Sequence, residues 1–234
     1  MAHHIHDHHK DVHGGALRAS VFGASDGLVS NVLLIIGVAG ADVSTSTVRV
    51  TGIVGLLAGA ISMAAGEYVS VRAQADLVKG ELDRERTALA EEPEHETEEL
   101  AELYVERGLD LEQATAVAQA LMANPETALR VHAREELGVD PDDLSSPWVA
   151  AFSSLFAFAF GAFLPLIPWF FGSGNVAIWA SLCLALVGAA LIGVLLSLQT
   201  QQSMWRTVAR QVGIAAGAAV ITYAIGSAVG VQVS

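Results

Sequence analysis

Positive charge and cysteine are both scarce in this chain. Its 234 residues hold 12 Lys and Arg against 25 Asp and Glu, a formal net charge of −13. Proteins that bind nucleic acid concentrate basic residues on one face, so this class is excluded. The single cysteine, Cys183, lies in an apolar stretch, permits no internal disulfide and is predicted to pack. The sequence also has no nucleophile–histidine arrangement, glycine-rich phosphate loop or CxxC pair, and we predict that the chain is not an enzyme.

Charge is also missing from one long stretch. No Asp, Glu, Lys or Arg occurs between Leu144 and Trp205, which is too long for one membrane span and sufficient for two. The mean hydropathy of the chain is +0.48. Acidic residues are concentrated in residues 76–143, which hold 20 of the 25 acids and six of the 12 bases. The sequence thus separates into apolar segments and one acidic block.

Five apolar segments have the length of a membrane span, which takes about 20 residues for ~30 Å of hydrocarbon. These segments are residues 19–41, 50–71, 148–171, 176–198 and 208–231. The fold class predicted from them is an all-α membrane protein of five transmembrane helices, with a cytoplasmic three-helix metal-binding domain inserted between helices 2 and 3. The expected divisions are a disordered His-rich tail (1–16), helices 1 and 2 (17–75), the acidic domain (76–146) and helices 3–5 (147–234).

Helix start and stop signals subdivide these segments. Pro93 is expected to stop the helix that continues from the second span. Asp110 and Asn124 are expected N-caps, because their side chains can accept hydrogen bonds from free backbone N–H groups. Gly108 and Gly138 are expected helix terminators. In the third span the prolines of "FLPLIP" are expected to kink or end the helix.

Basic residues set the expected orientation. Eleven of the 12 Lys and Arg fall in the N-terminal segment, the acidic block and the region between the fourth and fifth spans, and only Arg49 lies on the other side. The positive-inside rule then places the N-terminus and the acidic domain in the cytoplasm. The compact, Ala- and Gly-rich chain favours a prokaryotic plasma membrane, with a vacuolar-type membrane as the alternative.

Two carboxylates lie within the expected spans. A charge at mid-bilayer costs at least ~2.5–3.5 kcal/mol, so Asp26 and Glu67 are predicted to be functional. Met63 precedes Glu67 by four residues and shares its helix face. Two carboxylates and a thioether suit a divalent transition metal better than calcium or magnesium. The three residues are therefore predicted to line a metal translocation path. The alternative is that each acid is neutral or paired with an arginine near the interface.

Acidic side chains recur at helical spacing in the acidic block. Like charges at this spacing destabilise a helix unless something neutralises them, as bound cations would. The alternative is a solvated charged face. The candidate metal ligands are Glu81, Glu85, Glu96, Glu99, Glu102, His132 and Glu136.

Histidine and glycine form two further patterns. Six of the eight histidines lie in residues 3–13, a tract predicted to be a weak collector of transition metals. Gly52, Gly55 and Gly59 include a GxxxG step, which favours close helix approach. The sequence leaves open whether that approach lies within one subunit or at a dimer interface.

Several motifs resemble the vacuolar iron transporter family. They are "FGASDGLVSNVLLIIGVAGA", "GLLAGAISMAAGEYVSVRAQAD", "EELAELYVERGL", "HAREELG" and "GAFLPLIP", and the resemblance covers roughly residues 17–232. It implies a homodimer of five-span subunits with a cytoplasmic three-helix metal-binding domain. It further implies export of iron(II), and often manganese(II), in exchange for protons. No prosthetic group is expected, and zinc and cobalt are further candidate cargoes.

The resemblance also assigns roles by position. Asp26 and Met63 resemble the family's translocation site, and four glutamates resemble its cytoplasmic metal ligands: Glu85, Glu96, Glu99 and Glu136. The chain departs from the family pattern in the membrane: Gly55 stands where well-understood members have a second acid, and Glu67 where they have glycine. It also departs in the acidic domain, where Ala88 replaces a glutamate and a methionine pair is replaced by His132 and Ala133. Histidine is a more general ligand than methionine and would widen the metal preference.

The sequence thus predicts a proton-coupled exporter of divalent iron and manganese, with membrane lipid, metal ions, protons and a second copy of the chain as partners. A membrane-anchored metal buffer or sensor is the alternative of another class, and a passive metal channel is a third.

Overall fold

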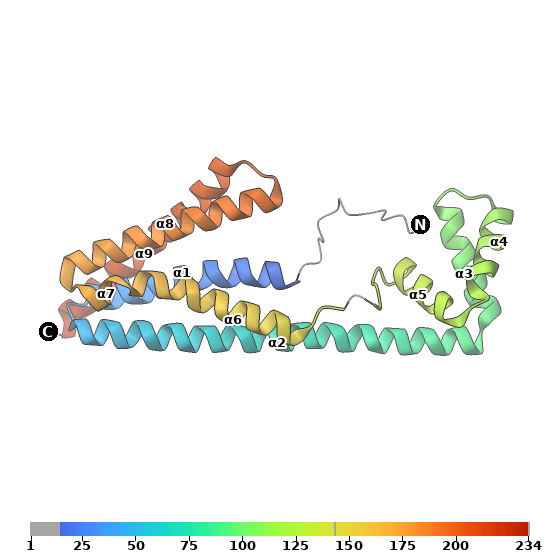
Figure 1. The fold of residues 1–234 in the computed structure, drawn as a ribbon, viewed down its shortest axis with the longest axis horizontal. Helices are drawn as coiled ribbons and strands as arrows, with labels where there is room; N and C mark the ends of the chain where they lie inside the picture. Colours follow the sequence, from blue (N-terminus) through green and yellow to red (C-terminus); the bar gives the residue numbers. More distant parts are fainter. Residues whose placement is uncertain (1–14, 143, 234) are drawn as a thin grey trace, which may run out of the picture. The chain divides into compact units, whose positions relative to one another are not determined.

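The computed structural model describes residues 15–142 and 144–233, and within these ranges it contains helices and no strand (Figure 1). The helices are α1 (Gly15–Gly40), α2 (Thr45–Glu91), α3 (Pro93–Glu106), α4 (Leu111–Met122), α5 (Pro125–Glu135), α6 (Pro147–Phe163), the 3-10 helix η1 (Leu164–Leu166), α7 (Pro168–Phe171), α8 (Gly174–Thr200) and α9 (Met204–Val233). The His-rich tract at residues 3–13 lies outside the described residues.

In the described part of the chain, five helices are long and apolar enough to cross a membrane. They correspond to the five predicted spans, but the second belongs to a helix of 47 residues, α2. The polar half of α2 continues as a helix because ion pairs at i,i+3 and i,i+4 support it, such as Arg72–Asp76 at 3.1 Å and Arg84–Glu81 at 2.7 Å. The third span is broken as predicted: α6 ends at Phe163, and Pro165 and Pro168 begin the short helices that follow.

The described chain divides into two compact units. Within the described residues, 15–69 with 147–233 form the first, here called the membrane unit, and 70–142 with 144–146 form the second, called the acidic unit. Helix α2 contributes its apolar half to the membrane unit and its charged half to the acidic unit.

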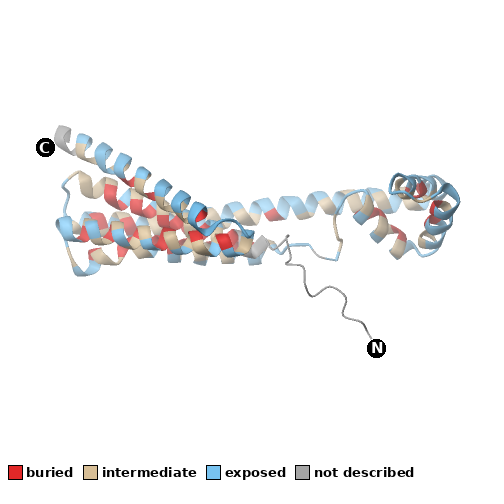
Figure 2. Cartoon of the chain, turned by 90° about the horizontal axis from the view of Figure 1, so that it is seen from above, coloured by how far each residue is buried: buried red, intermediate tan, exposed pale blue. Residues whose placement is uncertain are grey.

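The membrane unit is packed around α1. Its buried core joins Leu28 and Val32 of α1 to alanines of α8 and α9. Helix α6 approaches α1 closely, since a Cβ atom on Gly27 would collide with the carbonyl oxygen of Phe158, and one on Gly161 with that of Ala24. In Figure 2 the buried residues of this unit, in red, are gathered in the bundle of packed helices.

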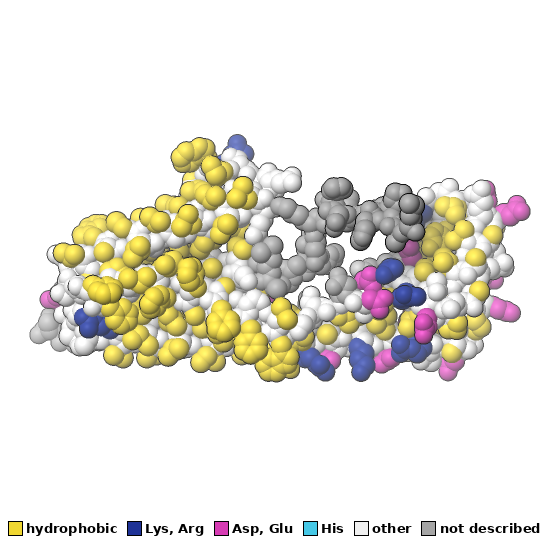
Figure 3. Space-filling view, viewed as in Figure 1, with side chains coloured by type: hydrophobic (Ala, Val, Ile, Leu, Met, Phe, Trp, Pro, Cys, Tyr) yellow, Lys and Arg dark blue, Asp and Glu magenta, His cyan; other side chains and the backbone are white. Residues whose placement is uncertain are grey.

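The outward faces of the membrane unit are apolar (Figure 3). Phe156 and Phe160 are each 67% exposed, and Val220 is 69% exposed. A soluble protein rarely exposes so much contiguous apolar surface, whereas lipid would cover it at no cost. The glycines of the GxxxG pattern instead face inward: a Cβ on Gly59 would run into the ring of Phe158, and one on Gly52 into Leu166. These close approaches therefore lie within one chain.

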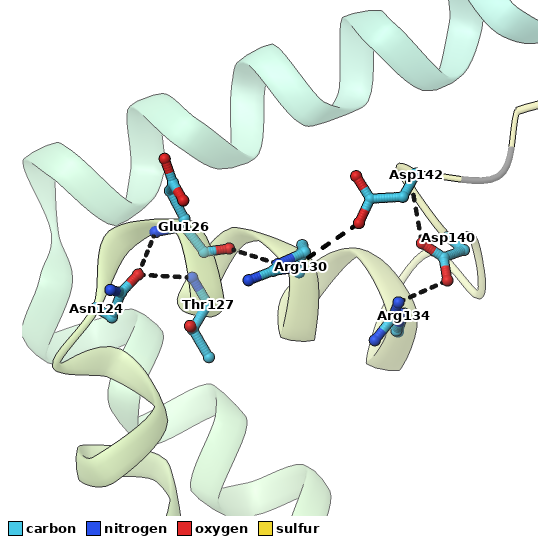
Figure 4. A network of polar contacts seen from close by, with 7 residues as sticks. All are labelled: Asn124, Glu126, Thr127, Arg130, Arg134, Asp140 and Asp142. Atoms are coloured by element: carbon cyan, nitrogen blue, oxygen red, sulfur yellow. Dashed lines mark hydrogen bonds and ion pairs between the residues drawn. The ribbon is translucent and has the colours of Figure 1, made fainter. Parts of the chain in front are cut away.

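The acidic unit has a small core of its own. Leu100 and Ala101 of α3 pack against Ala114 and Ala118 of α4. Both predicted N-caps are confirmed, and the Asn124 side chain accepts from the backbone N–H groups of Glu126 and Thr127 at 3.0 Å (Figure 4). The predicted terminators Gly108 and Gly138 adopt φ of +103° and +65°, a region that favours glycine.

Candidate metal sites

Four side chains from three helices meet in the acidic unit. Glu85 comes from α2, Glu96 from α3 and His132 from α5. Glu136 is the C-cap residue that directly follows α5. One ligand atom of each lies within 4.8 Å of the others. We call this group the acidic cluster.

The imidazole of His132 lies at the centre of the acidic cluster. Its Nδ1 is 2.8 Å from Glu136 Oε1, 3.0 Å from Glu85 Oε1 and 3.7 Å from Glu96 Oε2. One ring nitrogen carries at most one proton, so it cannot satisfy three carboxylates. The ring is fully buried, and among the described residues its Nε2 has no hydrogen-bond partner and the buried Glu85 Oε1 has only its contact with Nδ1. A divalent cation would provide the positive charge that these buried oxygens lack, and carboxylates with an imidazole are ligands that iron and manganese accept.

Burial and crowding also change the acidity of the cluster. The pKa of Glu96 is raised above its ordinary value, first by desolvation and then by the nearby charge of Glu99, while His132 acts in the opposite direction. A proton therefore competes with metal for this carboxylate at a higher pH than for an exposed glutamate.

Polar contacts at both ends of α5 hold the cluster's histidine in place. Asn124 caps the start of the helix, and near its end Arg134 donates to Asp140 at 2.6 Å (Figure 4). Arg107, at the end of α3, forms an ion pair with Glu135 and so joins α3 to α5. These contacts fix the register of α5 relative to the glutamate of α3.

Three predicted ligands lie outside the acidic cluster. Glu81 pairs with Arg84 at 2.7 Å, Glu99 lies 3.6 Å from the ring of His95, and Glu102 is exposed. Part of the charge crowding along these helices is thus relieved by local basic partners. Their role as ligands stays a prediction of the sequence.

A second candidate site is a pocket of about 310 Å³ in the membrane unit. It is lined by residues of α1, α2 and α6: Phe22, Asp26, Ser30, Asn31, Leu34, Gly55, Gly59, Ser62, Met63 and Phe158. Asp26 and Met63, two of the three residues predicted for the path, share this pocket. The Ser30 hydroxyl, which donates to the backbone carbonyl of Asp26, lies 3.1 Å from the Asp26 carboxylate.

The third predicted path residue, Glu67, is half-buried one helical turn beyond Met63 and does not line the pocket. Among the side chains that the structure describes, neither Asp26 nor Glu67 forms an ion pair. Arg72, the basic residue that follows Glu67 along α2, pairs with Asp76 instead. The contacts therefore give no support to the arginine-paired alternative.

Three polar residues of the pocket were not predicted from the sequence: Ser30, Asn31 and Ser62. Asn31 is the clearest omission, because it is 2% exposed and hydrogen bonded to another helix. The available signal was an amide side chain in an apolar span, which lipid disfavours unless protein groups satisfy it.

The five membrane-length helices define the class as a multi-pass membrane protein. The polar pocket among the helices and the separate cluster of carboxylates and imidazole supply side chains that can bind metal cations. Comparison with known proteins narrows this class. The family model described as "VIT family" matches residues 17–227, and the chain belongs to this family.

Three relatives illustrate the similarity. Vacuolar iron transporter 1 of Arabidopsis thaliana is 35% identical over 166 residues, covering 70% of this chain and 66% of that protein. The vacuolar iron transporter of Acanthamoeba castellanii is 42% identical over 161 residues, covering 68% and 58%. Vacuolar iron transporter 1 of Eucalyptus grandis is 34% identical over 191 residues, covering 80% and 77%. The matched segments thus span less than two thirds of the first two relatives. All three are named as transporters, which agrees with the prediction that this chain is not an enzyme.

Proposed function

We propose that this protein transports divalent iron, and manganese with it, out of the cytoplasm in exchange for protons. The observation that carries the proposal is the pocket in the membrane unit, where a carboxylate and a thioether, Asp26 and Met63, line one open space between apolar helices. Such a costly carboxylate is typical of an ion pathway. The names of the relatives support iron as cargo.

In this mechanism the pocket holds the desolvated cation. The Asp26 carboxylate supplies charge, and the Met63 sulfur supplies a softer ligand that favours a transition metal over calcium or magnesium. Glu67, one turn further along α2, is proposed to pass the ion between the pocket and the acidic unit. A proton arriving from the far side neutralises a carboxylate and releases the metal.

The acidic cluster is proposed to bind cytoplasmic metal before transport. Its four ligands leave coordination positions for water, so exchange with solvent remains open. The basic residues that flank the spans support a cytoplasmic location for this unit and for the N-terminus. The exposed apolar faces of the membrane unit suit lipid and a second copy of the chain, and we propose a homodimer in a prokaryotic plasma membrane.

Metal flux into proteoliposomes tests this function. Iron(II), kept reduced with ascorbate, and manganese(II) are presented separately, with and without an imposed pH gradient. We expect gradient-dependent flux for the wild type and at least a tenfold loss for Asp26→Ala, because removal of an intramembrane ligand affects every transport cycle. Flux that is the same with and without the gradient, at matched membrane potential, would instead indicate a passive channel.

A membrane-anchored metal buffer or sensor is the second candidate. It is favoured by the fact that all four ligands of the acidic cluster lie within the acidic unit, so metal binding there needs no membrane residue. Metal binding without flux, abolished by His132→Ala and unchanged by Asp26→Ala, would establish this function in place of transport.

A further inference from the structure

Asn31 lies in the middle of α1 and is buried, with 2% of its surface exposed. Its Nδ2 donates a hydrogen bond to the backbone carbonyl of Ala162, at the end of α6, at 2.6 Å. A carbonyl oxygen can only accept, so this contact fixes which end of the amide faces α6. The amide oxygen must point the other way.

That oxygen, Oδ1, has no hydrogen-bond partner among the described residues. Leaving a buried acceptor unpaired is costly, and such a group in a folded protein calls for an explanation. Asn31 is one of the residues that line the pocket with Asp26 and Met63. The unpaired oxygen is therefore part of the space in which the cation is proposed to bind.

Gly55 is the residue of α2 that faces this oxygen, which is itself buried. A Cβ atom added at Gly55 would lie 2.9 Å from Asn31 Oδ1 and would collide with Leu34 Cδ2. Any side chain at position 55 would therefore cover the amide oxygen or displace it. Other glycines of α2 are not so constrained, since a Cβ on Gly66 would meet no atom within 4 Å.

We propose that Asn31 Oδ1 is a neutral oxygen ligand of the transported cation, and that Gly55 leaves this oxygen free of a covering side chain from α2. This inference rests on the proposed function of the pocket. An amide oxygen binds divalent cations but does not titrate. Asn31 thus adds affinity without adding a proton-exchanging group, whereas Asp26 provides both. The pocket combines one carboxylate, one thioether and one amide oxygen.

Asn31 has an alternative role, which is to join α1 to α6 through the Ala162 carbonyl. The two roles differ in what they affect. Loss of a structural contact lowers stability and the amount of active protein. Loss of a ligand raises the concentration of metal needed for half-maximal flux and leaves the folded fraction unchanged.

The test measures KM and Vmax for iron(II) flux in proteoliposomes of the full chain. Asn31→Leu removes the ligand, Asn31→Asp keeps an oxygen ligand but loses the hydrogen bond to Ala162, and Gly55→Ala keeps the Asn31 side chain but places a methyl group against its oxygen. Gly66→Ala, on the same helix, is the matched control. We expect KM to rise about tenfold or more in Asn31→Leu and Gly55→Ala, since even outer-shell partners of a metal are worth 10–100-fold. The KM of Gly66→Ala should stay within about twofold of the wild type, and Asn31→Asp, which keeps an oxygen ligand, should recover part of the affinity lost in Asn31→Leu.

A KM that is unchanged in both Asn31→Leu and Gly55→Ala, with only Vmax or stability reduced, would overturn the ligand role and leave transport standing. Failure of transport itself is separated by a second measurement. Manganese(II) binding is followed by electron paramagnetic resonance on the purified full chain carrying Glu96→Gln and His132→Ala, which silence the acidic cluster. Weaker binding on adding Asn31→Leu supports the ligand even if the wild type shows no flux, and unchanged binding overturns it.

Discussion

Glu96 is crowded by other charges, and replacing it with glutamine should change stability in opposite directions with and without metal. Its side chain is 9% exposed, and its oxygen lies within 4.8 Å of ligand atoms of Glu85, His132 and Glu136. Two carboxylates at 4.8 Å repel by about 3.5 kcal/mol at an effective dielectric constant of about 20. The imidazole and the partial exposure of Glu136 reduce this figure. We expect metal-free Glu96→Gln to be more stable than the wild type by roughly 1 kcal/mol.

With metal the difference changes sign, because the variant has lost a ligand. A cation at 100 times its dissociation constant stabilises the folded wild type by about 2.7 kcal/mol. If the variant binds about tenfold more weakly, the same concentration stabilises it by only about 1.4 kcal/mol. The metal-dependent part of the stability should therefore fall by about half or more.

Hydrogen–deuterium exchange of the amides in α3, α4 and α5, with chelator and with manganese(II), measures both quantities. Glu98→Gln is the matched control, because Glu98 is exposed on the same helix and lies outside the acidic cluster. Glu99→Gln decides whether this predicted ligand contributes. A wild-type chain that manganese(II) does not protect, or a variant that is destabilised in chelator, would refute the reasoning.

Three further predictions follow from named contacts. Burial raises the pKa of Glu96 above its ordinary 4.5, so its protonation stabilises the metal-free fold at pH values below 4.5, and this contribution is lost as the pH rises through the raised pKa. Exchange protection of α3 in chelator should therefore fall as the pH rises above about 4.5, while manganese(II) affinity in titrations should rise. Gly27→Ala should cost about 1–3 kcal/mol in thermal or denaturant unfolding, since the new Cβ meets the Phe158 carbonyl, whereas Gly66→Ala should cost nothing. Asn124→Ala removes two cap hydrogen bonds and should lower the local stability of α5 by about 1 kcal/mol, measured as faster amide exchange in its first turn.

Local signals were sufficient to predict most helices of the fold. Apolar length identified the five spans, because a membrane helix needs only a run of about 20 apolar residues. The caps at Asp110 and Asn124 were predictable because a cap bonds to backbone groups two or three residues away. The full length of α2 was also predictable, since the helix of the second span was expected to continue until Pro93 and ends at Glu91.

The sequence alone also determined which chemical groups are available: an acid and a thioether in the spans, and a surplus of glutamates around one histidine in the acidic block. Only the tertiary structure decided which of them meet. Glu81 and Glu85 share a helix and a spacing pattern, yet only Glu85 reaches His132, and Asn31 presents its oxygen to the pocket because a carbonyl of α6 takes its amide hydrogen. The physical reason is that helical periodicity fixes neighbours three and four residues apart, whereas convergence of distant side chains depends on how helices cross and how closely glycines let them approach.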